Sequence, residues 1–108
     1  MKSTIKYIQG LNGSRFEING VTYAYGYTCS RTREFARMAE KDHEDAIKYG
    51  WKNPYPLKPF IGDILKEVCP DWRTARWTGV NIFAGRPLRP EEIRKIKKDI
   101  EEEELKNV

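Results

Sequence analysis

The sequence predicts a small α+β domain, in which an antiparallel meander sheet is covered by two helices and followed by an additional C-terminal helix. Three observations support this prediction. The pairs Asn12-Gly13 and Asn19-Gly20 divide the start of the chain into three segments, and Asn-Gly favours the two-residue turns of β-hairpins. Two later stretches repeat apolar residues at helical spacing. A length of 108 residues is typical of one domain.

The three N-terminal strands are expected over residues 3–10, 14–18 and 21–28. If both Asn-Gly pairs form two-residue turns, Phe16 lies opposite Tyr23, and Tyr7 lies opposite Ile18. Side chains alternate between the faces of a strand, so both turns place one common set of apolar residues on the same face. This set consists of Ile5, Tyr7, Phe16, Ile18, Val21, Tyr23, Tyr25 and Tyr27.

Two helices are expected to cover this apolar face. Over residues 32–49, one half of the helical wheel is mainly apolar and the other half carries most of the charges. Ser30 or Thr32 can cap the start of this helix, and Gly50 can end it. A shorter helix is expected over residues 60–68, where apolar residues again recur every three to four positions.

A fourth, later strand is expected over residues 77–84, because Val80, Ile82 and Phe83 favour strands. Prolines interrupt the chain before and after this region and exclude longer helices there. We therefore assign residues 1–89 to a single α+β domain.

Residues 90–108 are expected to form a charged C-terminal helix that starts at Pro90. Its apolar stripe is narrow, with Ile93, Ile96 and Ile100, and its basic residues precede the acidic run Glu101–Glu104. Acidic residues at a helix C-terminus oppose the helix dipole. Two interpretations stay open. The helix forms an antiparallel homodimer through the three isoleucines, or it is a solvated tail with internal Lys–Glu pairs.

The net charge of +4 is unevenly distributed along the chain. Residues 1–37 carry +4, residues 38–56 carry −1, residues 57–89 carry +3 and residues 90–108 carry −2. No apolar run approaches the roughly 18–20 residues that span a bilayer, and the first residues do not suggest a secretory signal. We therefore expect a cytoplasmic protein without a membrane partner, in which Cys29 and Cys69 are reduced thiols.

The sequence contains no arrangement typical of catalysis. The single histidine, His43, has Asp42 beside it in sequence, but adjacent residues on a helix do not face each other. Asp42 lies in the apolar half of its helix and would need a buried partner there. Two cysteines and one histidine do not supply a four-ligand zinc site. We expect no enzyme activity, no metal and no cofactor.

Two basic clusters with neighbouring aromatics are the main functional signal. Arginine binds phosphate with two parallel hydrogen bonds, and aromatic rings stack on bases. The first cluster lies where a strand meets the start of a helix, a position that favours anions. It consists of Tyr25, Tyr27, Ser30, Arg31, Arg33 and Arg37. The second cluster consists of Trp72, Arg73, Arg76, Trp77 and Asn81.

These clusters predict a non-catalytic binding protein for a phosphate-bearing nucleotide. The ligand would be a small nucleotide signal, which the protein sequesters, or a short single-stranded nucleic acid. A general duplex-binding protein usually carries a larger basic surface. The alternative is a mobile-element-type accessory protein that inhibits a host nuclease or defence complex by binding it. Tyr and Arg side chains would then be interface hot spots.

Overall fold

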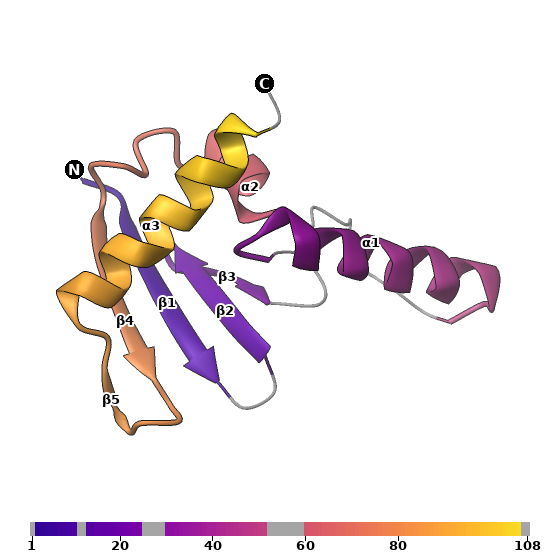
Figure 1. The fold of residues 1–108 in the computed structure, drawn as a ribbon, viewed down its shortest axis with the longest axis horizontal. Coiled ribbons are helices and arrows are strands. Elements are labelled where there is room, and N and C mark those ends of the chain that lie inside the picture. The colour runs from indigo at the N-terminus through magenta and orange to yellow at the C-terminus, as the bar shows by residue number, and fades with distance from the viewer. Residues whose placement is uncertain (1, 11–12, 25–29, 52–59, 107–108) are drawn as a thin grey trace.

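A five-stranded sheet forms one layer of the protein, and helices lie on one side of it in the computed structural model (Figure 1). The structure describes residues 2–10, 13–24, 30–51 and 60–106. The strand order is β3-β2-β1-β4-β5. The elements are β1 Thr4–Gly10, β2 Gly13–Ile18, β3 Val21–Ala24, α1 Arg33–Lys48, α2 Ile61–Val68, β4 Arg76–Asn81, β5 Arg86–Pro87 and α3 Pro90–Leu105.

The two predicted hairpins are present, one of them in a different register. Asn19 and Gly20 both have positive φ, 49° and 85°, as the predicted type I′ turn requires, and Phe16 lies opposite Tyr23. In the first hairpin, however, Gly10 pairs with Gly13, so Tyr7 lies opposite Phe16 rather than Ile18. A shift by two residues keeps every side chain on its face. The predicted apolar face is therefore present, and four of its residues are buried: Ile5, Tyr7, Phe16 and Ile18.

The prediction of a purely antiparallel sheet is wrong, because β4 runs parallel to β1. Helices α1 and α2 lie in the connection between β3 and β4, and a crossover of this length permits a parallel strand. The fourth strand also ends earlier than expected, at Asn81. A turn with positive φ at Gly85 then leads into the short strand β5, which pairs antiparallel with β4.

Helix α3 covers most of the apolar face of the sheet. The sequence instead predicted that the two earlier helices would cover this face. Figure 1 shows α3 lying across β1 and β4, and Ile96 and Ile100 are in the same core as the sheet residues. Ile100 is 0% exposed and Ile96 3%. These two isoleucines are therefore buried within one chain and cannot supply the homodimer interface suggested by their spacing.

Helix α2 packs at the end of α3 and contributes Ile61, Ile64 and Leu65 to the core. Helix α1 projects away from the layered part of the protein (Figure 1). Thr32 caps its start by accepting a hydrogen bond from the Phe35 amide, and Gly50 follows its end with a φ of 73°, as predicted.

The larger apolar side chains of α1 do not cover the sheet. Its buried residues are the small ones, Ala36, Ala39 and Ala46. None of the helices in the described part of the chain has the length and apolar content to cross a membrane.

Replacing Ile100 with alanine should lower the free energy of unfolding by about 2–5 kcal/mol, because the truncation opens a cavity between α3 and the sheet. Leu105→Ala is the matched control on the same helix, since Leu105 is 72% exposed. It should change stability by no more than about 0.5 kcal/mol. Urea denaturation measures both values. Equal, small effects at the two positions would show that α3 is not held against the sheet.

Candidate functional site

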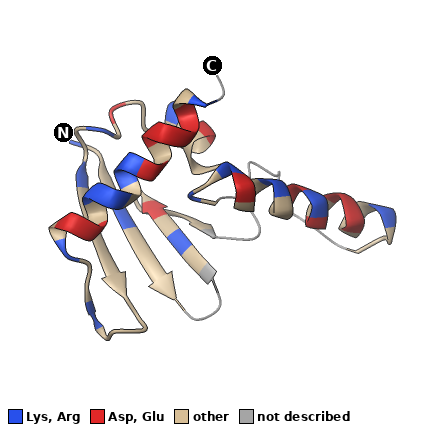
Figure 2. Ribbon diagram, viewed as in Figure 1, with Lys and Arg blue, Asp and Glu red and all other residues tan. Residues whose placement is uncertain are grey.

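The acidic half of α3 lies against arginines of both predicted basic clusters. Figure 2 shows basic residues in the middle of α3 and acidic residues toward its C-terminal end. From the first cluster, Arg31 Nε lies 3.2 Å from Asp99 Oδ2. From the second, Arg73 Nε lies 2.8 Å from Glu101 Oε1, and Arg73 Nη2 lies 2.9 Å from Glu104 Oε2. The two clusters are therefore neutralised in part by carboxylates of the same chain.

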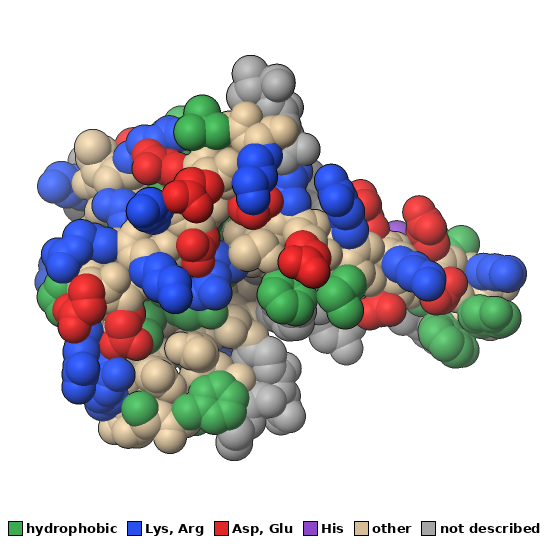
Figure 3. Space-filling model, in the orientation of Figure 1, with side chains coloured by type: hydrophobic (Ala, Val, Ile, Leu, Met, Phe, Trp, Pro, Cys, Tyr) green, Lys and Arg blue, Asp and Glu red, His purple; other side chains and the backbone are tan. Residues whose placement is uncertain are grey.

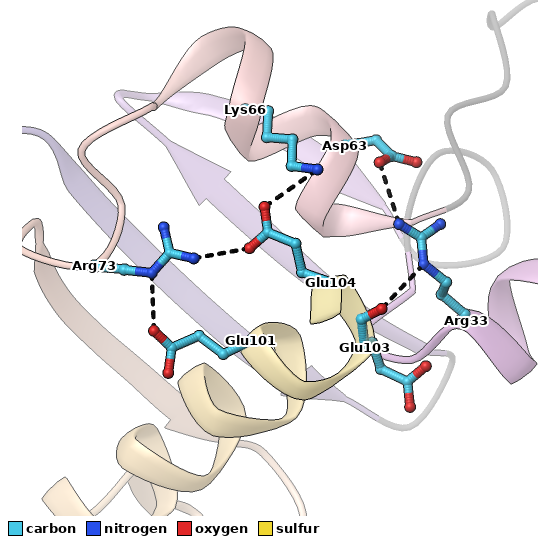
Figure 4. Close-up of polar contacts among 7 residues, drawn as sticks. All are labelled: Arg33, Asp63, Lys66, Arg73, Glu101, Glu103 and Glu104. Carbon is cyan, nitrogen blue, oxygen red and sulfur yellow. Dashed lines mark hydrogen bonds and ion pairs between the residues drawn. The ribbon is translucent and has the colours of Figure 1, made fainter. Parts of the chain in front are cut away.

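The pairs around the end of α3 form a network (Figure 4). Glu104 also binds Lys66 of α2, at 3.2 Å. Arg33 lies on the other side of the helix end (Figure 4), where its Nε donates to the carbonyl of Glu103 and its Nη2 lies 3.5 Å from Asp63. These three cations offset the unfavourable position of acidic residues at a helix C-terminus.

The structure does not bring the two clusters together into one ligand site. Asp99 and Glu101, which hold Arg31 and Arg73, are two positions apart on α3. Two positions on a helix are separated by about 200° around its axis. The two clusters therefore contact different sides of α3.

Most of the second cluster is used for packing and turns. Trp72 is buried at 2% exposure, and its carbonyl accepts a 2.7 Å hydrogen bond from the Trp77 indole. Trp72 therefore cannot stack on a base. Asn81 accepts a hydrogen bond from the Ala84 amide and shapes the turn after β4. Only Arg76 of this cluster is exposed without an ion pair to any described residue.

The first cluster is described only in part, because Tyr25 and Tyr27 lie outside the described residues, as does Cys29. Arg37 is exposed on α1. The expectation that Asp42 is buried is wrong, since Asp42 is exposed, whereas His43 is half-buried at the edge of the helix. Within the described part of the chain, no group of three or more His, Cys, Asp or Glu residues is placed to hold a metal.

The described cysteine, Cys69, is a structural residue. Burial raises the pKa of its thiol, which then donates to Asp71 Oδ1 at 3.5 Å. The Ser3 hydroxyl donates to the same carboxylate and lowers the pKa of Asp71. A protonated, buried thiol is a poor nucleophile.

Comparisons with known proteins add nothing to these observations. No family model, curated protein or solved structure matches the chain.

A pocket of about 250 Å³ lies beside the first cluster. The Tyr7 and Phe16 rings, whose centroids lie 4.7 Å apart, form part of its wall. The Tyr7 hydroxyl donates a hydrogen bond to Ser14 Oγ. The predicted register places Tyr7 and Phe16 on the same face but not opposite each other, and the observed pairing brings them together. The pocket is lined by Tyr7, Gln9, Ser14, Phe16, Ser30, Arg31 and Phe35.

A second candidate surface is the α1 stripe, which we define as Phe35, Met38, Tyr49 and Trp51. These side chains are 46%, 57%, 61% and 63% exposed, and the Tyr49 and Trp51 rings lie 5.5 Å apart. Figure 3 shows hydrophobic side chains exposed near the start of α1 and at its far end. The sequence places Phe35, Met38 and Tyr49 on the apolar face of a covering helix, and it places Trp51 in the loop that follows.

Replacing Glu104 with glutamine should reduce the free energy of unfolding by about 1 kcal/mol, because one carboxylate holds both Lys66 and Arg73. The matched control is Glu102→Gln, since Glu102 is 56% exposed and lies 3.9 Å from its single partner. The difference between the two variants in free energy of unfolding should shrink in 1 M salt, where the Debye length is about 3 Å. Urea denaturation at two salt concentrations tests this expectation. Equal effects of the two substitutions would contradict the network.

Proposed function

We propose that the protein is a non-catalytic binding protein that docks on a partner protein through the α1 stripe. The observation that carries this proposal is the exposure of four large apolar side chains on α1 and directly after its end, in an element that projects from the domain (Figure 1). A group of exposed apolar residues with a polar surround is typical of an interaction surface.

The energetics of α1 support the same conclusion. An isolated helix of 16 residues is marginal in water, because most helix stability comes from packing of the apolar face. Described contacts hold α1 at its N-terminal end, where Ala36 enters the core and Arg33 meets Asp63. Along the rest of the helix only the small side chains of Ala39 and Ala46 are buried. A partner on the stripe would supply packing along the rest of the helix.

The charge of α1 favours a protein over a nucleic acid as the partner. Helix α1 contains five acidic residues and four Lys or Arg residues, so it does not offer the positive field that binds a phosphate backbone. Aromatic and methionine side chains are enriched at protein interfaces. Tyr49 and Trp51 supply the kind of rigid aromatic anchor that acts as a hot spot.

The hypothesis of nucleotide sequestration has less support. Arg31, Arg33, Arg73 and Arg76 were expected to hold phosphate, and the first three have carboxylate partners within the chain. A small, charged domain that covers the surface of another protein fits an inhibitor of a nuclease or defence complex. We extend the proposal to this class of partner.

The double variant Met38→Ala/Tyr49→Ala should reduce recovery of the partner from a cell extract at least about tenfold, a loss typical of removing a hot spot. Quantitative mass spectrometry of proteins retained by the tagged chain measures recovery. The matched control is Ile82→Ala/Phe83→Ala, which truncates two side chains 45% and 60% exposed in the turn before β5. The control should retain the partner. Equal recovery with both double variants would contradict the assignment of α1, and both must unfold at the wild-type temperature.

A further inference from the structure

We propose that the pocket between β1, β2 and the start of α1 binds a small organic anion. Its carboxylate or phosphate group would contact Arg31 and Ser30, and an aromatic ring would lie against Phe16 and Phe35. This ligand site shares only Phe35 with the α1 stripe, and its ligand is smaller than a nucleic acid.

Ser30 provides the first observation that points to a ligand. Ser30 is 1% exposed and is one of the residues that line the pocket, and its Oγ has no hydrogen-bond partner among the described residues. Its backbone is fixed by a bridge to Phe60 and by a 2.9 Å hydrogen bond from the Ile61 amide to its carbonyl. Burying a hydroxyl without a partner is unfavourable, so a ligand atom that accepts a hydrogen bond from it would be stabilised there.

Arg31 supplies the positive charge. A guanidinium has five N–H donors, and Asp99 is the only ion-pair partner of Arg31 among the described residues, through Nε. The side chain keeps 38% exposure, so its terminal nitrogens can reach an incoming anion. Helix α1 begins two residues later, and the positive end of its dipole adds to the attraction.

The remaining walls favour an aromatic ring. The Tyr7 and Phe16 rings contact each other at 4.7 Å, and Phe35 from α1 lines the same pocket. The Tyr7 hydroxyl donates to Ser14 Oγ, which leaves the Ser14 proton free to donate to a ligand. A volume of about 250 Å³ lies below the roughly 300–1,000 Å³ of sites for drug-sized ligands. A single ring with one acidic group is the size class that fits.

The ion pair between Asp99 and Arg31 allows the anion site to be tested by two opposite changes in affinity. The carboxylate of Asp99 holds Arg31 in the free protein, so it competes with the ligand anion for the same guanidinium. Removing the charge of Asp99 should therefore strengthen binding, whereas removing the charge of Arg31 should weaken it. A pocket that is merely hydrated would show neither effect.

The test is isothermal titration of the full chain with phenyl phosphate, benzoate, inorganic phosphate and neutral benzyl alcohol. At least one ring anion should bind more tightly than inorganic phosphate and benzyl alcohol. If phenyl phosphate binds more tightly than benzoate, the natural ligand class is a phosphate ester, and the opposite order indicates a carboxylate. Failure of both ring anions to bind, or equal binding of benzyl alcohol, would overturn the proposal.

The variants locate the site. Arg31→Gln should weaken binding of the ring anion at least tenfold, Ser30→Ala should weaken it several-fold, and Asp99→Asn should strengthen it. Arg37→Gln is the matched control, because Arg37 is exposed on α1 and does not line the pocket. An unchanged affinity in both Arg31→Gln and Asp99→Asn would overturn the proposal, even if one variant folds poorly. Met38→Ala/Tyr49→Ala should leave this affinity unchanged, so the two proposals fail separately.

Discussion

The docking of α3 across the sheet determines the arrangement of most other parts of the protein. Ile96 and Ile100 belong to the same core as the apolar residues of β1 and β2, and removal of apolar surface from water is the main favourable term in folding. Because α3 occupies this position, α1 cannot cover the face. Its larger apolar residues are left on the surface as the α1 stripe.

The position of α3 also explains its segregated charges. Its acidic half ends among Arg33, Lys66 and Arg73, which come from α1, α2 and the link before β4. These cations lie where the negative end of the helix dipole and four glutamates would otherwise repel each other. The acidic half of the charge pattern that suggested an antiparallel homodimer is paired within one chain. The basic excess of the sequence is correspondingly less available to an external polyanion.

Local chemistry made much of the fold predictable. Asn19-Gly20 determines its turn because both residues adopt positive φ, and the bounds of the three helices follow from caps, prolines and apolar spacing. The direction of β4 was not predictable, because it depends on a crossover of two helices rather than on its own residues. The choice of covering helix was not predictable either. Three amphipathic helices compete for one sheet face, and the narrow isoleucine stripe of α3 occupies it rather than the broader stripe of α1.

In the candidate sites, too, features set by local sequence were predictable and features that depend on distant residues were not. The sequence predicts that Ser30 and Arg31 lie just before a helix, and both residues line the pocket. The aromatic wall was missed because the register of the first hairpin differs by two residues. The ion pairs of Arg73 join residues 28 and 31 positions apart. No local pattern in the sequence indicates such pairs.

Native-state amide hydrogen exchange tests the central role of α3 most directly, because protection reports the free energy needed to open each element. The account predicts that amides around Ile96 and Ile100 are protected as strongly as those of β1. It also predicts that amides in the last turns of α1, before Lys48, exchange much faster. Rapid exchange throughout α3 while β1 stays protected would contradict it, because α3 would then be a detached tail.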